Sequence, residues 1–358
     1  MSVRGLHKII YPFAPDQSGA VSVLYELGGM IIIVDAGGCS GNVCGFDEPR
    51  WLGTKSAVFS AGLRDMDAIL GRDDLLVQKI TEAAEKIDAG FVAIIGTPVP
   101  ATIATDYRAL KRMTEKRAGL PAITIASNGI QWYDRGASNA YVELIRKFAG
   151  EPGEPVIAGS VGVLGLTPLD TGCKDAPEKV KALLTAGGAS EVLCYGSGHS
   201  ISDIAGAGRM ERNIVVSPSG LRAARYLKDK YGTPYTCEDP MAEDVLSRLE
   251  IDANDLEGRK ILLIHQQIRA NALRRLLRKV SDADITVASW FMMDDEISEA
   301  GDIRIRSEED FFRILQEGGY DTVIADDGLR KAAKGYCSAF CDLPHFAVSG
   351  RTEEQVYG

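Results

Sequence analysis

The chain alternates short apolar, β-branched runs with segments of helical period, and this alternation limits the fold more than any other feature of the sequence. The run Met30-Ile-Ile-Ile-Val34 ends in a glycine turn, and further runs at 91–95 and 122–126 follow stretches whose apolar residues recur at helical spacing. Strands that alternate with helices favour βαβ units and a parallel sheet. The pattern therefore predicts an α/β protein.

The alternation falls into three blocks, which predict three consecutive Rossmann-like parallel α/β domains. The segment Gly150-Glu-Pro-Gly-Glu-Pro155 closes the first block, because Pro and Gly at this density cannot continue a helix. We place the N-terminal domain at 1–150, the middle domain at 151–257 and the C-terminal domain at 258–358. A length of 358 residues agrees with two or three domains.

Within the blocks, each apolar run is assigned to a strand and each stretch of helical period to a helix. We expect strands at 30–34, 91–95, 122–126, 156–164, 191–195, 213–216, 260–265, 284–289, 322–325 and 346–348. We expect helices at 74–86, 106–118, 139–148, 176–186, 221–230, 241–249, 271–280 and 308–317. Ligands of such folds bind beyond the carboxyl ends of the strands, so the loops that follow the strands are the places to search for a site.

Charge and hydropathy narrow the classes of function. The formal net charge of −10 disfavours binding to nucleic acid or to anionic lipid. No apolar stretch approaches the ~20 residues of a membrane helix, and the first residues lack the pattern of a signal peptide. We therefore expect a cytoplasmic protein. Its seven cysteines, in a reducing compartment, are expected to be buried thiols or metal ligands rather than disulfides.

The loop after the first strand carries the most specific chemistry. Cys39 and Cys44 are separated by four residues and surrounded by Gly37, Gly38, Gly41 and Gly45. Thiolates bind iron, and glycines let backbone N–H groups approach an inorganic cluster. Two cysteines are only two ligands, however, and a tight glycine turn with two buried thiols explains the same pattern. Nearby, Glu48 and Arg50, with Asp47, are expected to brace this loop as ion pairs rather than to contact substrate.

Other candidate residues have simpler interpretations. Cys337 and Cys341 would share one face of a helix and could bind a metal, but packing of both thiols near the C-terminus is the preferred interpretation. His199 follows a predicted strand and could transfer a proton or bind a metal there, but a position in a surface glycine loop without a chemical role is the preferred interpretation. His7 and His265 are expected to be structural. The chain has neither a Gly-x4-Gly-Lys-Ser/Thr phosphate loop nor a Gly-x-Gly-x2-Gly turn that opens a helix after a strand, so we expect no ATP or dinucleotide site of these kinds.

Several segments, taken together, resemble the nitrogenase component 1 family. The opening resembles that family in the segment Tyr11-Pro-Phe-Ala-Pro-Asp-Gln-Ser-Gly-Ala20, in the strand at 29–34 and in the Gly-Cys turn at Cys39. The run 46–51 is similar to the smaller nitrogenase-like members. Further similarity lies at 96–106, 213–218, 230–235 and 343–349. The resemblance spans nearly the whole chain and is strongest across 10–110.

The resemblance implies an iron–sulfur cluster between paired subunits and electrons supplied by an ATP-dependent iron protein. Cys39 matches the cysteine of the family's Gly-Cys turn. The family's other cluster cysteines would fall near Tyr11–Phe13 and Pro98, and its molybdenum cofactor cysteine near Val216, where this chain has none. Dinitrogen reduction with that cofactor is therefore not expected. A homodimer in which each copy offers Cys39 and Cys44 would supply four thiolates, the number that a [4Fe–4S] cluster takes.

The leading hypothesis is a nitrogenase-like component 1 oxidoreductase subunit. It would receive electrons from the iron protein, its reductase, through the cluster and reduce a substrate that the sequence does not identify. The alternative is a non-catalytic protein that uses the same fold to bind a metal complex or a tetrapyrrole as a scaffold. A third interpretation is a structural relative whose cluster site stays empty.

Overall fold

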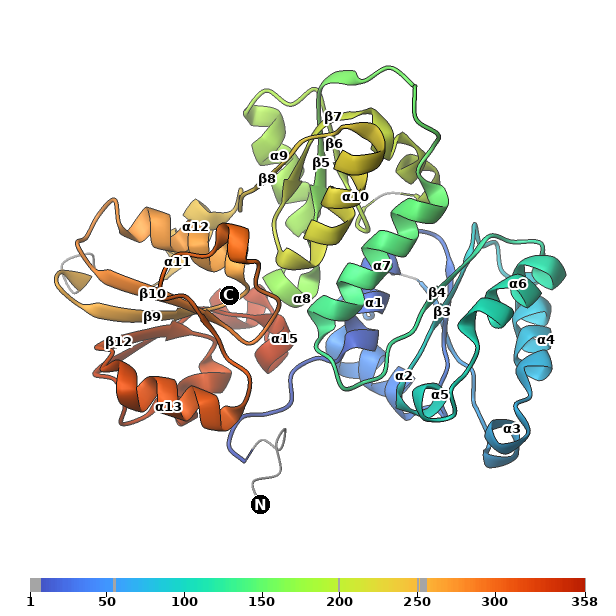
Figure 1. Cartoon of the computed structure of the whole chain (residues 1–358), viewed down its shortest axis with the longest axis horizontal. Helices are drawn as coiled ribbons and strands as arrows, with labels where there is room; N and C mark the ends of the chain where they lie inside the picture. Colours follow the sequence, from blue (N-terminus) through green and yellow to red (C-terminus); the bar gives the residue numbers. More distant parts are fainter. Residues whose placement is uncertain (1–7, 54–55, 199, 250, 252–255, 358) are drawn as a thin grey trace.

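The computed structural model describes residues 8–53, 56–198, 200–249, 251 and 256–357. These residues form three sheets, and each lies in one of the three lobes seen in Figure 1. Every strand pairing within these sheets is parallel, and helices cover the sheets. The predicted class is thus confirmed: the protein is α/β, with three consecutive Rossmann-like units.

The first sheet has the strand order β2-β1-β3-β4. Its strands are β1 (Met30–Ile33), β2 (Ala57–Ser60), β3 (Val92–Ile95) and β4 (Ala122–Ile125). Side chains alternate between the two faces of a strand, so Met30 and Ile32 pack under one pair of helices and Ile31 and Ile33 under another. The first pair is α4 (Asp73–Ala84) and α6 (Tyr107–Ala118), and the second is α1 (Asp16–Leu24) and α7 (Tyr133–Phe148).

The second sheet has the order β6-β5-β7-β8. Its strands are β5 (Ile157–Leu164), β6 (Glu191–Cys194), β7 (Met210–Val215) and β8 (Tyr235–Cys237). The helical segments of this lobe are α8 (Pro168–Thr171), α9 (Ala176–Ala186), η2 (Ile201–Arg209), η3 (Pro218–Gly220) and α10 (Leu221–Tyr231). Helix α11 (Ala242–Arg248) packs instead in the core of the third sheet, next to α12 (Gln267–Leu277; Figure 1).

The third sheet has the order β11-β10-β9-β12-β13. Its strands are β9 (Lys260–Ile264), β10 (Asp284–Ser289), β11 (Ile303–Arg304), β12 (Thr322–Ala325) and β13 (Ala339–Asp342). The helices that follow the second sheet are α12 (Gln267–Leu277), α13 (Glu308–Gly318), α14 (Arg330–Ala333), α15 (Phe346–Ser349) and α16 (Glu353–Tyr357), with short 3-10 turns η5 (Asp295–Ile297) and η6 (Asp327–Leu329). The strand predicted at 346–348 is wrong, because this segment is the short helix α15.

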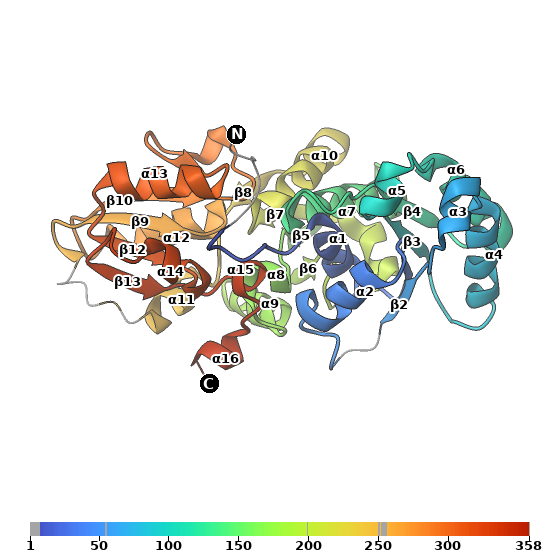
Figure 2. The same cartoon turned by 90° about the horizontal axis from the view of Figure 1, so that it is seen from below.

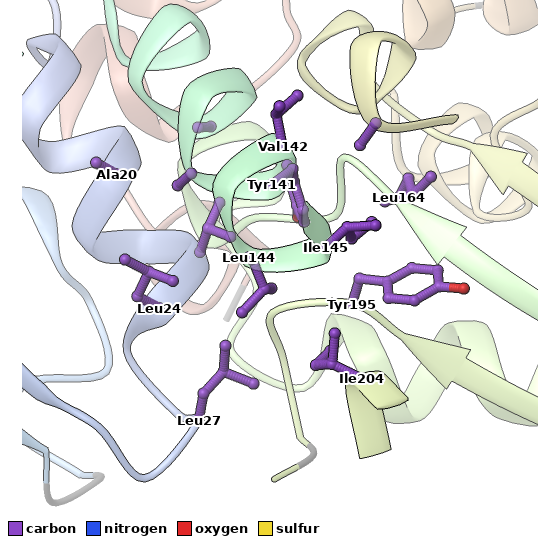
Figure 3. Close-up of a cluster of buried hydrophobic side chains, with 14 of the residues drawn as sticks. Ala20, Leu24, Leu27, Tyr141, Val142, Leu144, Ile145, Leu164, Tyr195 and Ile204 are labelled. Atoms are coloured by element: carbon purple, nitrogen blue, oxygen red, sulfur yellow. The ribbon is translucent and has the colours of Figure 1, made fainter. Parts of the chain in front are cut away.

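Helix α7 joins the first two lobes through one core. Figure 3 shows Tyr141 and Ile145 of α7 between α1, which carries Leu24, and the second sheet, which carries Leu164. All of these side chains are buried. Within the described ranges, no sheet crosses residue 150 or residue 257, as expected for separate units. The domain boundaries at these residues remain a proposal, because α7 packs on both sides of the first.

Figure 2, which views the molecule from below, places α16 at the C-terminal end of the chain, apart from the three sheets. Among the helices of the described residues, none combines the length and the apolar character that crossing a membrane would require.

Candidate functional site

Cys39 lies where the chain leaves β1 at the carboxyl edge of the first sheet. Strand β1 pairs with β2 on one side and with β3 on the other. The chain runs from β1 toward β2 and from β3 toward β4, so the loops after the neighbouring strands β1 and β3 lead in opposite directions. Parallel α/β folds bind ligands in the crevice at such a reversal of strand order. The hydroxyl of Thr97, in the loop after β3, donates to the Val34 carbonyl at the end of β1 at 2.8 Å and so ties the two loops together beside Cys39. Cys39 therefore lies at the crevice where parallel α/β folds bind their ligands.

Asp35 and Gly37 determine where the helix that carries Cys39 begins; this helix, α2 (Gly38–Asn42), is called the cysteine helix below. Asp35 is almost fully buried, and its carboxylate accepts hydrogen bonds from the backbone N–H of Ser40 at 2.7 Å and from the Ser60 hydroxyl at 2.6 Å. Gly37 has φ +117° at the turn into helix α2, a conformation that residues with a Cβ atom rarely adopt. These two residues fix where the helix with Cys39 begins.

Helix α2 continues directly into a π-helical turn, η1 (Val43–Asp47), which carries Cys44. The turn is closed by the hydrogen bond from the Glu48 N–H to the Val43 carbonyl at 2.9 Å. Single π turns are rare and occur often at functional sites. Sequence reasoning missed this turn, because its residues have no distinctive helical or strand preference.

Both cysteines of the loop are half-buried thiols in the described structure. Burial, followed by the charge of Asp35, raises the pKa of Cys39. Burial, followed by the charges of Glu48 and Asp35, raises the pKa of Cys44. Both are therefore protonated at neutral pH when no metal is bound, and a bound cation would have to replace the two protons.

The expected charged brace beside the loop is confirmed for Glu48 and Arg50. The Arg50 guanidinium is buried and donates from Nε and one Nη to the two Glu48 oxygens, each at 2.7 Å. The same Nη donates to the Ser22 carbonyl of α1 at 2.7 Å. Asp47 is not part of this pair, since it accepts from the Ser18 hydroxyl at 2.6 Å and from the Asn42 amide at 2.7 Å. Both interactions tie the loop to its surroundings.

A groove of about 800 Å³ runs beside the cysteine helix, between the first and third lobes. Phe46 from η1 and Tyr11 from the N-terminal segment line it and are 73% and 75% exposed. Trp132 and Phe346 add two more aromatic side chains, and Arg351 adds a cation. The sequence did not indicate this groove, because its lining comes from segments more than 300 residues apart and forms no local motif.

A second arrangement that sequence reasoning missed is a buried polar cluster where the three lobes meet. The Tyr133 hydroxyl donates to Asp170 at 2.5 Å and lies 2.8 Å from Nε2 of His345. The rings of His345 and His265 are stacked with centroids 4.1 Å apart. Burial raises the pKa of Asp170 to about 7, whereas burial and then the charge of Arg269 lower the pKa of His345 to about 3. The structural role expected for His265 agrees with this position.

The alternative cysteine pair does not form the expected helix. Cys341 lies in strand β13, which pairs with β12, and Cys337 lies in the turn before it. The two thiols contact the backbone carbonyls of Asp342 and Ala333 and pack against different apolar clusters. Among the described residues, no group of three or more His, Cys, Asp or Glu side chains is arranged to hold a metal ion. His7 and His199 lie outside the described residues.

Comparison with known proteins decides the family. The model of the family described as Nitrogenase component 1 type Oxidoreductase matches residues 17–249. The chain belongs to this family. The match includes α1, the cysteine helix and nearly the whole of the first two lobes, so the resemblance inferred from the sequence is confirmed.

Two curated relatives show the breadth of the family. The chain is 26% identical over 184 residues to the nitrogenase iron-molybdenum cofactor biosynthesis protein NifE of Bradyrhizobium diazoefficiens, which covers 49% of this chain and 32% of that protein. It is 27% identical over 215 residues to a subunit of the light-independent protochlorophyllide reductase of Rubrivivax gelatinosus, which covers 56% of this chain and 39% of that protein. The chain thus matches well under half the length of either relative.

Solved structures share the fold over almost the whole chain. Nitrogenase Cp1 at pH 6.5 superimposes with a TM-score of 0.70 and 11% identity, over 93% of this chain and 85% of that one. Nitrogenase Cp1 at pH 5 gives a TM-score of 0.68 and 15% identity, over 92% and 82%. At this level of identity, the likeness establishes the architecture alone.

Proposed function

We propose that this family member is a component 1 type oxidoreductase subunit that accepts electrons through an iron–sulfur cluster bound at Cys39 and Cys44. The observation that carries the proposal is the position of the two half-buried thiols, on a helix that runs into a π turn at the ligand-binding edge of the first sheet. Family membership supports the chemistry. The name of one relative, a protochlorophyllide reductase subunit, supports a reductive role.

The donor set of one chain fits half of a cluster site. Cys39 and Cys44 offer two thiols, and four thiolates complete the ligation of a [4Fe–4S] cluster. Two copies related by a two-fold axis would present the same patch to each other and would supply all four. When bound, the cluster would supply single electrons at low potential. The cysteine helices would hold it, and the braced Glu48–Arg50 loop would keep the helices in place.

The surface beside the cysteines supports an interface at this position. Phe46 and Leu52 are 73% and 94% exposed, and Trp51 between them is also exposed. The three residues are close in sequence, and exposed apolar side chains that lie together mark protein interaction sites. We therefore propose that a second copy covers this patch. The electron donor would be an ATP-dependent iron protein, as the resemblance to component 1 subunits implies.

The groove beside the cysteine helix is the proposed binding place of the substrate. Its volume of about 800 Å³ suits an organic ligand of substantial size. Aromatic walls favour a flat apolar body, whereas Arg351 at the rim is already paired with Asp342 and Asp326. Because η1 with Phe46 forms one wall, a ligand in the groove would lie next to the turn that carries Cys44.

A second candidate function is a scaffold that holds a metal complex without reducing it. Two observations favour it. Burial, followed by the charges of the acidic neighbours Asp35 and Glu48, raises the pKa of the loop thiols and so opposes thiolate formation. The relative NifE is named as a cofactor biosynthesis protein, which is a role other than catalysis.

One experiment separates the two functions. The full chain is purified without oxygen, reconstituted with iron and sulfide, and mixed with a reduced iron protein of the nitrogenase type. A brown protein whose absorption near ~400 nm bleaches only when MgATP and the iron protein are both present supports the oxidoreductase. A cluster or metal complex that binds but is never reduced supports the scaffold. A colourless protein without iron rejects both.

A further inference from the structure

A second thiol of the protein lies in direct contact with a lysine, far from the cysteine loop. Cys173 follows α8, and Lys179 lies one turn into α9. Nζ of Lys179 donates to Sγ of Cys173 at 3.0 Å. The thiols of Cys194, Cys337 and Cys341 contact backbone carbonyls instead. The sulfur–nitrogen contact is therefore a distinct chemical feature of the second lobe.

Small molecules can reach this pair. Cys173 and Lys179 line a cavity of about 230 Å³, which Arg248, Glu353 and Tyr357 also line. The Lys179 side chain is 35% exposed, so the nitrogen borders solvent while the sulfur lies deeper. A cavity of this size admits water, dioxygen or hydrogen peroxide.

The C-terminal helix is attached to the same lysine. Nζ of Lys179 lies 3.2 Å from the Glu353 carboxylate at the start of α16, and Arg248 donates to the same oxygen at 3.1 Å. The Glu353 N–H also donates to the Gly172 carbonyl at 3.0 Å. Lys179 thus contacts a thiol on one side and a carboxylate, which can accept a proton, on the other.

The resting pair is a neutral thiol beside an ammonium group. Burial raises the pKa of Cys173 to about 11. Desolvation works to lower the pKa of Lys179, but the hydrogen bond to Cys173 and the charge of Glu353 outweigh it and raise that pKa to about 12. Neither group is a ready nucleophile at neutral pH, so the pair does not suit a simple catalytic role. Its close contact suits a slower oxidative reaction.

We infer that Cys173 and Lys179 form an oxidation site in which a single oxygen atom links the sulfur to the nitrogen. One thiol, one ammonium group and one dioxygen give one S–O–N bridge, one water and one proton. Sulfur and nitrogen lose two electrons each, and dioxygen takes up all four. The thiol S–H and two N–H bonds of the ammonium group break as the S–O and O–N bonds form, one N–H bond remains, and Glu353 is placed to accept the released proton.

The bridge changes how the C-terminal helix is held. A bridged nitrogen is uncharged, so its ion pair with Glu353 is lost. Of the two cations that the described residues place on that carboxylate, Arg248 remains. Helix α16 follows Ser349, Gly350 and Arg351, which border the large groove beside the cysteine loop. Oxidation at Cys173 would therefore loosen the segment that forms one rim of that groove.

The test compares the full chain kept without oxygen with the same chain exposed to air. Intact-mass spectrometry without reductant should show the gain of one oxygen atom and the loss of two hydrogen atoms, reversed by dithiothreitol. A tryptic digest should yield one species that contains both Cys173 and Lys179. The variants Cys173→Ser and Lys179→Arg should abolish it, and Lys179→Arg keeps the positive charge that α16 needs.

Lys174→Arg is the matched control, because Lys174 lines the same cavity, and it should still form the bridge. Four results would overturn the inference: no change of mass in air, sulfinic acid at Cys173 with Lys179 free, loss of two hydrogens without added oxygen, or the bridged mass in Lys179→Arg.

Discussion

Gly136 of α7 lies against the backbone of Asp16 in α1, where a Cβ atom added to the glycine would stand 1.7 Å from the Asp16 carbonyl oxygen. The relation is reciprocal, since a Cβ atom on Gly19 of α1 would stand 1.8 Å from the Tyr133 carbonyl oxygen. The two helices therefore cross in backbone contact. The cysteine loop is attached to α1 through Arg50 and Ser22, so this crossing supports the candidate site.

The first prediction concerns this crossing. Gly136→Ala forces the helices apart and should lower the free energy of unfolding by ~1–3 kcal/mol or more, as overpacking does in cores. Urea denaturation followed by circular dichroism measures the loss. Gly206→Ala is the control, because a Cβ atom there meets nothing within 4 Å. Equal stability of the two variants would show that the helices do not touch as described.

The second prediction concerns the ligands of the proposed cluster. Cys39→Ser and Cys44→Ser should each reduce iron bound after anaerobic reconstitution by about half or more, because each removes one of the thiolates that the cluster requires. Cys237→Ser removes a half-buried thiol of β8 in another lobe and should leave iron unchanged. Full iron content in both loop variants would place the cluster elsewhere.

The third prediction concerns the brace. Arg50→Ala leaves the Glu48 carboxylate buried without its partner, which should cost ~3–5 kcal/mol of folding free energy and should also lower iron binding at Cys44. Arg50→Lys should retain only part of the stability, because lysine keeps the positive charge but cannot form the two parallel hydrogen bonds. Arg72→Ala removes a long ion pair with Asp67, at 3.6 Å, in which the arginine is exposed, and should cost less than ~1 kcal/mol. Thermal and urea unfolding of the three variants decide the point.

The fourth prediction concerns the buried carboxyl of Asp170, whose pKa is raised to about 7 from an ordinary value of 3.8. Between these values the folded protein keeps a proton that the unfolded chain has released, so Asp170 makes the fold less stable as the pH rises through this window. Asp170→Asn removes this effect. Its unfolding free energy relative to wild type should therefore increase from pH ~4 to pH ~7, by on the order of 2 kcal/mol.

The control for that series is the wild-type protein, whose unfolding is measured in the same buffers at each pH. Parallel curves for Asp170→Asn and wild type would mean that Asp170 is ionised in the folded protein.

The fifth prediction concerns self-association. Phe46→Glu and Leu52→Glu place a charge on the exposed apolar patch beside the cysteines and should convert the proposed homodimer to a monomer in analytical ultracentrifugation. Leu183→Glu changes a side chain of α9 that is exposed in the second lobe and should not. A wild-type chain that is monomeric even after cluster reconstitution would refute the shared site.

The sequence predicted most strands and helices because their apolar residues recur at clear periods. The prediction failed for elements that are held by tertiary packing and whose residues show no periodic apolar pattern. Helix α7 begins at Tyr133, six residues before its predicted start at 139, because Gly136, Ala137 and Ser138 are small residues buried against α1 and carry no apolar period. Strand β2 was missed, since it is short, lies at the sheet edge and is only partly buried.

The short apolar run at 346–348 shows the limit of periodicity. Three buried residues suit a strand or a helix turn equally well. Here Asp326 accepts a hydrogen bond from the His345 N–H at 2.8 Å, which fixes how the chain enters α15. The candidate site could be predicted only in part. Cys39 and Cys44 lie close together in the sequence and could be recognised from it, whereas the groove and the Tyr133–Asp170–His345 cluster are formed by segments that are far apart in the sequence.

The position of α7 has a consequence for anyone who divides this chain into fragments. Tyr141 and Ile145 pack against the second sheet as well as against α1, so a recombinant piece that stops at residue 150 would carry an uncovered apolar stripe along its last helix. A piece that begins at residue 151 would lack the cover over Leu164 and Tyr195. The two halves are better expressed together. The junction near residue 257 is no better place to cut, because Ala242 and Val245 of α11 pack in the core of the third sheet.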